Sequence, residues 1–333
     1  MKFDFLNHNV RILSPNQTER FYNLRENLGA YFLQIAEKYS LIPEKIKLID
    51  GGINSVLIKF KNKSSSYLLK ITTNKDATSE IFFYRALSTN ALPVPKIINF
   101  DLSEDLIPYQ FFIMEEVEGV QSFQDHINDE TATKGGYIYA KELKKVHNIA
   151  VNGFGRPLDI GGLNWSQKSW LEALKSFFEE NAGYKNVENL FTSEQLKAIY
   201  RLTIVNQKLE ILKPCLLHGD IPNGLMQIKP TIKFLAFIDP SGIIGGDFLY
   251  DVSSIYHINE KGEIGVGFMK GFEKGCTEAY PMNNQEIYRF HCLRLFHLFW
   301  KSGFFYKHGW NTNLLHEQTI TKLDQIQKQY GIR

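Results

Sequence analysis

The stretch from Cys215 to Asp251 constrains this chain most, because it places acidic side chains directly after short apolar segments. One apolar segment ends in His-Gly-Asp220, and the next ends in Ile-Asp239-Pro. Both have the composition of short buried strands, so we expect the two carboxylates side by side at the mouths of adjacent strands. Such carboxylates repel each other unless a cation such as Mg²⁺, or a substrate that carries a proton, lies between them. The stretch therefore predicts a phosphoryl-transfer site.

The length and charge of the chain limit the kinds of protein that it can be. The chain has 333 residues, which exceeds one ordinary core, and 44% of them are hydrophobic. Its formal net charge of +2 provides no basic stripe of the kind that binds nucleic acids or anionic membranes. No apolar run reaches the roughly 18 residues that span a bilayer. We therefore expect two lobes, no nucleic-acid partner and no membrane.

The three cysteines, Cys215, Cys276 and Cys292, are widely spaced. An odd number without a Cys-x-x-Cys pair argues against a disulfide framework and a zinc site, and it favours a reducing compartment. The first residues also lack the apolar core of a signal peptide. We expect a cytoplasmic protein.

The N-terminal part reads as a helix within residues 14–40 followed by strands. After Pro43, apolar residues alternate in short runs up to residue 71, as in consecutive antiparallel strands joined by turns. Glycines in the first turn can bring backbone N–H groups close to a phosphate, but the residues alone favour a plain hairpin turn. This turn contains Gly51, Gly52, Asn54 and Ser55.

Lys70 ends the third predicted strand, and Glu80 follows in a predicted helix. A strand lysine that faces a helix glutamate can hold its ammonium at the α- and β-phosphates of a nucleotide. The alternative is a surface lysine and a glutamate favoured by the helix dipole.

The composition changes from strand-rich to helix-rich after an apolar strand that ends near Met114. We therefore expect an N-lobe of residues 1–115 and a C-lobe of residues 116–333. The adenine of a nucleotide is expected against the backbone of the connecting segment, which includes Glu115 and Val117.

The predicted C-lobe is mainly helical, with helices at 137–148 and 165–180 among others. His147 closes the first of these, where the helix dipole favours an imidazole, and we assign it no chemistry. The glycines of residues 265–271 look like a dinucleotide fingerprint, but the third is misplaced by one position and no clear strand precedes them. We reject that interpretation.

Four side chains of the central stretch have expected roles. Asp220 can accept a proton from a hydroxyl nucleophile, and Asp239 suits a magnesium ligand. His218 is expected to hold the loop by hydrogen bonds, and Asp251 to brace it by accepting backbone N–H groups. Aspartates are common in turns, so an accidental cluster is the alternative. The order and spacing of the motifs argue against it.

These motifs resemble the aminoglycoside phosphotransferase superfamily of small-molecule kinases, which includes fructosamine and choline kinases and shares the protein-kinase fold. The resemblance covers roughly residues 45–300. It is carried by His218-Gly-Asp220, Phe-Ile-Asp239, Gly-Asp-Phe-Leu-Tyr-Asp251, Tyr-Leu-Leu-Lys70-Ile with Glu80, and Leu-Lys-Lys-Val-His147. It implies an α+β, bilobal protein-kinase-like fold with a small antiparallel-sheet N-lobe and a larger, mainly helical C-lobe.

The resemblance also implies roles and ligands. Asp220 would be the catalytic base, Asp239 the metal ligand and Lys70 the phosphate clamp, partnered by Glu80. The turn with Gly51, Gly52, Asn54 and Ser55 would become the loop over the phosphates. The cofactors would be ATP, with GTP as an alternative, and Mg²⁺. The acceptor would be a hydroxyl of a small polar molecule such as an aminoglycoside-like antibiotic or a sugar amine, and the protein a monomer or homodimer.

One position departs from the family. The family has a magnesium-binding Asn five residues after the catalytic Asp, and here that position is Leu225. Leucine cannot bind magnesium, but Asn223 lies nearby in a loop shaped by Pro222 and Gly224. Three outcomes follow: a kinase with one metal, a kinase in which Asn223 replaces the missing ligand, or a nucleotide-binding pseudokinase without turnover.

Overall fold

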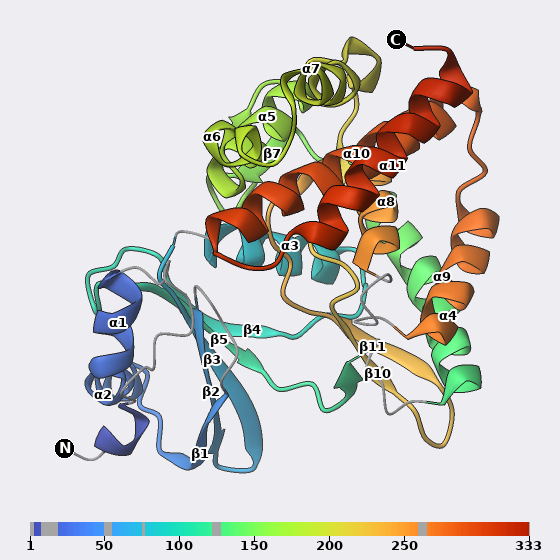
Figure 1. Cartoon of the computed structure of the whole chain (residues 1–333). Coiled ribbons are helices and arrows are strands. Elements are labelled where there is room, and N and C mark those ends of the chain that lie inside the picture. Colours follow the sequence, from blue (N-terminus) through green and yellow to red (C-terminus); the bar gives the residue numbers. More distant parts are fainter. Residues whose placement is uncertain are drawn as a thin grey trace. The chain divides into compact units, whose positions relative to one another are not determined.

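The protein is described by a computed structural model that covers residues 3–7, 19–49, 55–74, 77–121, 128–258 and 265–332. The chain forms two compact units. The first unit comprises Met1–Tyr84 and Pro95–Glu118, and the second comprises Arg85–Val94 and Gly119–Arg333. Figure 1 shows helices together with antiparallel strands along the chain.

The first unit is built on a five-stranded antiparallel sheet with the order β1-β2-β3-β5-β4. Its strands are β1 (Pro43–Ile49), β2 (Ser55–Asn62), β3 (Ser65–Thr72), β4 (Ile97–Asp101) and β5 (Gln110–Glu115). Its helices are η1 (Asp4–Leu6), α1 (Glu19–Glu26), α2 (Leu28–Lys38) and α3 (Ala77–Thr89), the last of which continues into the second unit.

The alternation of side chains along the sheet decides which residues meet which helix. In β3, Leu69 and Ile71 are fully buried in a core that also contains side chains of α1 and α2. Lys70 points to the opposite face, because successive residues of a strand alternate. It lies opposite Phe112 of β5, which contacts Tyr84 of α3. The sheet thereby directs Lys70 towards the helix that carries Glu80.

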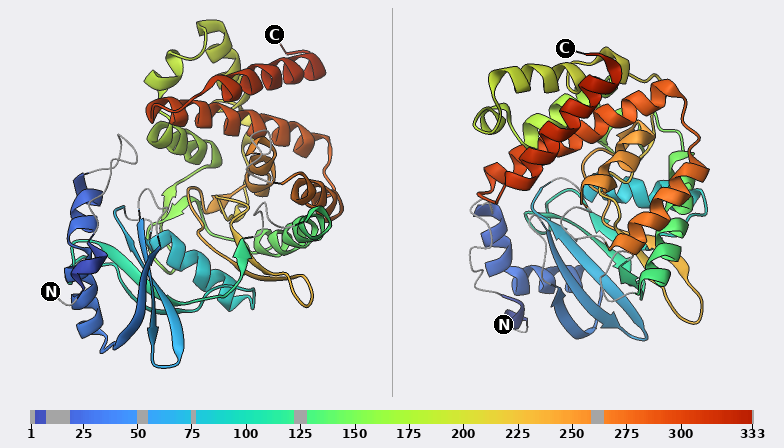
Figure 2. Two further views of the ribbon diagram at one scale, coloured as in Figure 1. Left: turned by 60° about the horizontal axis from the view of Figure 1, so that its bottom comes forward. Right: turned by 45° about the vertical axis from the view of Figure 1, so that its right-hand side comes forward.

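The second unit combines helices with two small antiparallel sheets, ordered β11-β10-β6 and β8-β7-β12-β9. Most of its helices are drawn in green to red in Figure 2. The strands are β6 (Val120–Gln121), β7 (Phe154–Pro157), β8 (Trp165–Gln167), β9 (Cys215–Leu216), β10 (Gly224–Gln227), β11 (Lys233–Phe237) and β12 (Gly245–Gly246). The helices are α4 (Asp129–His147), α5 (Trp170–Asn181), α6 (Tyr184–Glu188), α7 (Ser193–Leu202), η2 (Gln207–Leu209), α8 (Phe248–Ile258), α9 (Val266–Ala279), α10 (Asn284–Lys307) and α11 (Asn313–Tyr330).

Side-chain caps explain where the helices of the second unit begin. Asn128 accepts a hydrogen bond from the Thr131 backbone, so α4 starts well before the predicted residue 137. Ser169 caps α5 in the same way, and the preceding residues Trp165–Gln167 form β8 instead of the predicted helix. The predicted starts at 137 and 165 were therefore wrong, because local capping decides a helix start and apolar spacing does not.

Glycines allow α4 and α9 to pack with their backbones in contact. A Cβ atom at Gly271 of α9 would lie 1.8 Å from the carbonyl oxygen of Thr133, and one at Gly136 of α4 would lie 2.0 Å from that of Phe268. Gly267 has a similar contact with Asp129. The glycine spacing of residues 265–271 therefore serves helix packing, in agreement with its rejection as a nucleotide fingerprint.

Replacing Gly271 with alanine is expected to lower the free energy of unfolding by about 3 kcal/mol, because the helices must separate to admit the methyl group. Urea denaturation would measure the change. The matched control is Gly265→Ser at the N-cap of the same helix, where no atom lies within 4 Å of the added Cβ. Equal stability of the two variants would contradict the contact.

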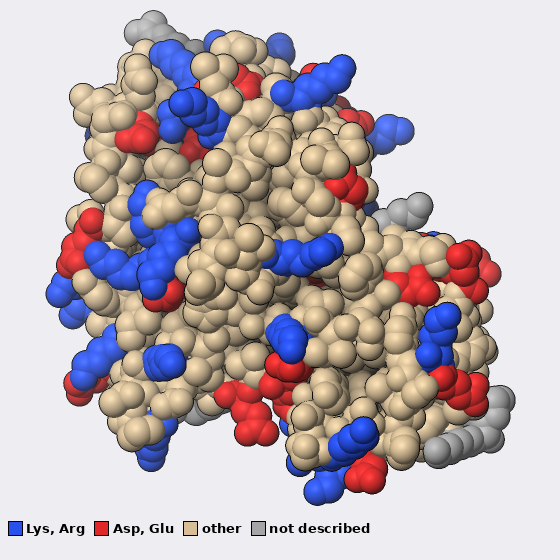
Figure 3. Space-filling view, turned by 180° about the vertical axis from the view of Figure 1, so that it is seen from behind, with Lys and Arg blue, Asp and Glu red and all other residues tan. Residues whose placement is uncertain are grey.

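The described helices include none that is long and apolar enough to cross a membrane. On the face shown in Figure 3, lysine and arginine side chains are interspersed with aspartate and glutamate.

Candidate active site

The loop after β9, residues 218–223, depends on a glycine at its second position. Gly219 has φ of 77°, and a Cβ atom there would lie 1.9 Å from the carbonyl oxygen of Ser241. Only glycine combines this left-handed backbone with so close an approach. A hydrogen bond from the Ser241 N–H to the His218 carbonyl (3.1 Å) fixes the contact. The His-Gly-Asp motif thus folds against the segment that follows Asp239.

The expectation that Asp220 and Asp239 follow adjacent strands was wrong. Asp220 comes after β9 and Asp239 after β11, and these strands belong to different sheets. The intervening β10 takes the place beside β11 and pairs with it. The two segments meet through their loops instead, where the Ile238 N–H faces the Asn223 carbonyl at 3.4 Å.

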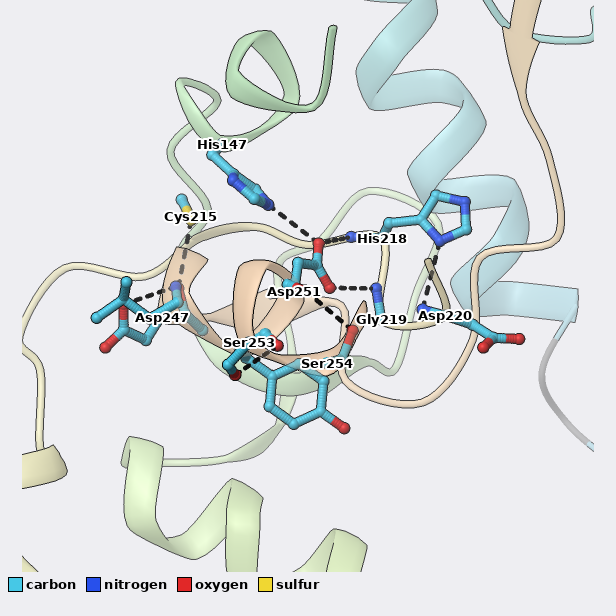
Figure 4. Close-up of polar contacts among 12 residues, drawn as sticks. His147, Cys215, His218, Gly219, Asp220, Asp247, Asp251, Ser253 and Ser254 are labelled. Atoms are coloured by element: carbon cyan, nitrogen blue, oxygen red, sulfur yellow. Dashed lines mark hydrogen bonds and ion pairs between the residues drawn. The ribbon is translucent and has the colours of Figure 1, made fainter. Parts of the chain in front are cut away.

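Asp251, on the first turn of α8, holds the backbone of the 218–223 loop (Figure 4). Its carboxylate accepts the N–H of His218 at 2.7 Å and the N–H of Gly219 at 2.9 Å. A third contact, of 3.0 Å, comes from Nε2 of His147. Burial opposes ionisation of this fully buried group, but the contacts with His147 and His218 still lower the pKa of Asp251. An ionised Asp251 therefore braces the loop.

His218 orders the same loop from within. Its Nε2 lies 2.9 Å from the Ile238 carbonyl, and its Nδ1 accepts the Asp220 N–H at 3.3 Å. A ring that donates at Nε2 and accepts at Nδ1 is a neutral imidazole. Burial lowers the pKa of His218, which agrees with that state. The ring therefore links Asp220 to the end of the Asp239 segment.

Asp220 carries an exposed carboxylate that accepts a 3.1 Å hydrogen bond from the Asn223 amide. Burial by the surrounding protein and the negative charge of nearby Asp239 raise the pKa of Asp220 to about 6. The positive charge of Lys301 and the hydrogen bond from Asn223 act in the opposite direction. Solvent at the exposed side chain moderates the effect of burial, but the neighbouring Asp239 acts in the same upward direction. Asp220 is therefore a carboxylate whose proton affinity approaches that needed of a base near neutral pH.

Asp239 has φ of 54°, a left-handed conformation that is costly for a residue before proline. Such strain persists where the surroundings determine the backbone, and it concentrates at functional sites.

Leu225, which stands where the family has its magnesium-binding Asn, is an ordinary strand residue of β10 that pairs with Ala236 and Gln121.

Magnesium is the metal that the family implies, and the donors in this region fit it. Asp239 offers a carboxylate and Asn223 an amide oxygen, the hard oxygen ligands that Mg²⁺ prefers. No group of three His, Cys, Asp or Glu suited to a metal occurs within the described ranges. Magnesium with a nucleotide needs no such cage, because it takes one or two protein ligands together with phosphates and water.

Within the first unit, Lys70 and Glu80 form an ion pair with an Nζ–Oε1 distance of 2.5 Å. The two residues are only 5% and 3% exposed, so the alternative of a surface pair is excluded. Burying two charges is costly unless they are paired. The pair therefore fixes the direction of the Lys70 ammonium.

The other predicted nucleotide-site residues are placed in part. Gly51, Gly52 and Asn54 lie outside the described residues, and Ser55 is the first residue of β2. Glu115 ends β5, and its N–H donates to the Lys96 carbonyl at 2.9 Å. Val117 lies two residues after the end of that strand and outside any helix or strand.

Two residues of the site were missed in the sequence. His147, to which no chemistry was assigned, contacts Asp251 and also Tyr280, whose hydroxyl lies 2.7 Å from its Nδ1. Arg289 of α10 pairs with the buried Asp247 at 2.9 Å. The signals for His147 were its place at a helix end and the family-like motif Leu-Lys-Lys-Val-His147, but nothing in a single sequence links residue 147 to residues 251 and 280.

A sequence profile described as the phosphotransferase enzyme family matches residues 45–280. A search of curated protein sequences gives no match.

Solved structures share the fold. Aminoglycoside phosphotransferase APH(4)-Ia is 17% identical with a TM-score of 0.64, over 90% of this chain and 99% of that one. A thermostable mutant of that enzyme, in a ternary complex with ADP and hygromycin B, has 17% identity and a TM-score of 0.66, over 89% and 97% of the chains. The protein assigned as a fructosamine-3-kinase in Haemophilus somnus 129PT has 16% identity and a TM-score of 0.56, over 88% and 95%. The predicted α+β protein-kinase-like fold is confirmed.

Proposed function

Because this chain belongs to the phosphotransferase enzyme family, we propose that it transfers the γ-phosphate of ATP to a hydroxyl group of a small polar molecule. The prediction of a small-molecule kinase of this family is confirmed by the family match and the shared fold. One observation carries the finer proposal. Asp220 stands on a loop whose backbone is held by the buried Asp251, as a positioned base requires.

The proposed mechanism assigns a role to each group. Asp220 accepts the proton of the acceptor hydroxyl as the phosphoryl group is transferred. Lys70, directed by Glu80, neutralises the phosphates of the nucleotide. Asp239 and Asn223 would hold Mg²⁺, which supplies positive charge to the phosphate oxygens when it is bound. His218 and Asp251 act by fixing the loop that presents Asp220.

The nucleotide proposal has support from the first unit and from a structural neighbour. The Glu116 N–H donates to the Ser66 carbonyl, whereas the Val117 N–H has no acceptor among the described residues and can serve an adenine. The mutant enzyme named above was solved with ADP. We propose ATP as the donor and Gly51, Gly52, Asn54 and Ser55 as the loop over its phosphates, with GTP as the alternative donor.

The acceptor is proposed as an aminoglycoside-like or amino-sugar compound, as hygromycin B is in the neighbouring complex. Aromatic side chains lie close to the loop. Phe177 of α5 approaches Gly242, and Trp300 of α10 packs edge-on against Phe177 with a distance of 5.1 Å between the ring centroids. Phe177 belongs to the buried core, so the partly exposed Trp300 is the ring that would give an acceptor site a flat apolar wall.

Turnover is favoured over the pseudokinase alternative by Asn223. Its amide nitrogen contacts the Asp220 carboxylate, which supports our proposal that this side chain serves as the second metal ligand. Leu225 is a paired residue of the strand β10 and has no donor atom for a metal.

The test of this function is consumption of ATP and of GTP with Mg²⁺ against a panel of aminoglycosides, glycated amines and choline. Acceptor-dependent release of ADP or GDP, together with mass-spectrometric detection of the phosphorylated acceptor, supports the proposal. Nucleotide binding without turnover across the panel would favour the pseudokinase.

Replacing Asn223 with alanine is expected to lower kcat by about 10-fold to 100-fold and to raise the magnesium requirement, because a metal ligand is lost. Leu225→Asn restores the family residue at its usual position, and we expect it not to rescue Asn223→Ala, because β10 pairing holds residue 225 in the strand. Magnesium titrations of both variants and of the double variant measure this. Indifference to Asn223→Ala would rule out its role as a ligand.

The rate is expected to rise with pH through a value near 6 and then to level off, because only ionised Asp220 accepts a proton. Lys301 opposes the upward shift, so Lys301→Met is expected to move this limb to higher pH. The control is Lys197→Met, an exposed residue of α7. Profiles of kcat/KM that coincide for Lys301→Met and wild type would contradict the assignment.

A further inference from the structure

Tyr280 follows α9 directly and ends a buried chain of hydrogen bonds. Its hydroxyl lies 2.7 Å from Nδ1 of His147, whose Nε2 lies 3.0 Å from Oδ2 of Asp251. Asp251 in turn holds the backbone N–H groups of His218 and Gly219. Two side chains therefore connect Tyr280 to the loop that carries Asp220.

The positions of the protons follow from the chemistry of each group. An ionised Asp251 can only accept, so Nε2 of His147 must carry hydrogen. Burial raises the pKa of Tyr280 well above its ordinary value, so the phenol keeps its proton. Nδ1 of His147 lies within hydrogen-bond reach of that hydroxyl. The imidazole is thereby held at both nitrogens, by Asp251 at Nε2 and by Tyr280 at Nδ1.

The ring of Tyr280 is fixed independently of its hydroxyl. It stacks on Phe248 of α8 with a centroid distance of 5.2 Å and an interplanar angle of 8°. The Lys144 ammonium lies 4.9 Å from the ring centre, and Tyr280 is only 3% exposed. A phenylalanine therefore fits the same position, and the change isolates the hydroxyl.

We propose that Tyr280 is a positioning residue for phosphoryl transfer, because its hydroxyl holds the imidazole of His147 in the orientation in which Nε2 contacts Asp251, which in turn holds the loop of Asp220. The proposal rests on the proposed function, since the loop position affects turnover only if Asp220 acts there. Without the hydroxyl, Nδ1 loses this hydrogen-bond partner, and the imidazole can turn away from the Asp251 carboxylate. The brace on the loop is then weakened.

The test uses Tyr280→Phe in the full chain. The ¹⁵N shift of His147 Nδ1 is expected to differ between wild type and the variant, because the hydrogen bond with the Tyr280 hydroxyl is lost. The kcat is expected to fall by about 10-fold to 100-fold, with KM for ATP nearly unchanged, because the loop and not the nucleotide site is disturbed. Unaltered ¹⁵N shifts in Tyr280→Phe would overturn the proposal.

The matched control is Tyr139→Phe. Tyr139 is fully buried, and its hydroxyl has no hydrogen-bond partner among the described residues. Its removal is expected to leave kcat and the His147 shifts unchanged. Equal losses of kcat in Tyr139→Phe and Tyr280→Phe would assign the effect to general packing and overturn the specific role.

A double-mutant cycle then asks whether Tyr280 acts through His147. In a His147→Gln background, Tyr280→Phe is expected to cause no further loss of kcat. Losses that multiply would show independent action and refute the proposed route. The ¹⁵N measurement needs no phosphate acceptor, so it tests the effect of Tyr280 on His147 even if the enzyme shows no turnover. Absence of turnover would instead count against the proposed function.

Discussion

Replacing Asp220 with asparagine is expected to lower kcat by about 10²-fold to 10⁴-fold, the usual contribution of a positioned general base. Asparagine keeps the size of the side chain and can still contact Asn223, but it cannot accept the acceptor's proton. Nucleotide affinity is expected to stay within about threefold of wild type, since the change removes no group assigned to the phosphates. Steady-state kinetics and calorimetric titration with ATP measure the two quantities.

The control for Asp220→Asn is Asp324→Asn, which removes an exposed carboxylate of α11. We expect it to keep the wild-type rate. An Asp220→Asn enzyme with more than half of the wild-type kcat would remove Asp220 from the role of base. Loss of ATP binding in the same variant would instead point to a collapsed loop.

Replacing Asp251 with alanine is expected to give the largest loss of stability, about 3–5 kcal/mol, together with loss of turnover. The change leaves two backbone N–H groups and one imidazole N–H without their buried acceptor, and each such loss is costly. Urea denaturation measures the free energy of unfolding. Asp324→Asn again serves as the exposed control, and a loss below about 1 kcal/mol would contradict the bracing role.

The pH dependence of this effect has a definite sign. The pKa of Asp251 is lowered in the folded protein, so its stabilisation is present above the unfolded value, about 3.9, and is lost as the pH falls through the folded value. The stability difference between wild type and Asp251→Ala should therefore be constant from pH 5 to 8 and shrink in stronger acid.

Local patterns in the sequence predicted the parts of the fold that depend on neighbouring residues. The alternation of Val56, Ile58 and Phe60 predicted β2, because one face of this strand is buried, and the apolar run around Lys70 predicted β3. Residue types at the ends of apolar runs predicted the loop of Asp220. The single helix expected within residues 14–40 was wrong, because the described part contains two helices that meet at Asn27.

Long-range contacts could not be predicted in this way. The pairing of β11 with β10 separated the strands of Asp220 and Asp239, and strand order depends on the whole unit. The bond between His147 and Asp251 joins residues 104 positions apart, and the imidazole gives no local sign of its partner. The functional roles of the site residues stay predictions until the variants are measured.

The direct contact of α4 with α9 restricts where residues can be inserted into or deleted from this chain. His147 lies roughly three helical turns beyond Gly136, so the glycine and the histidine share one face of α4. A single inserted residue between them would rotate the imidazole by about 100° about the helix axis. We therefore expect insertions and deletions to be tolerated in the loops before and after these helices. Between Gly136 and His147 we expect them to disrupt the contact with Asp251.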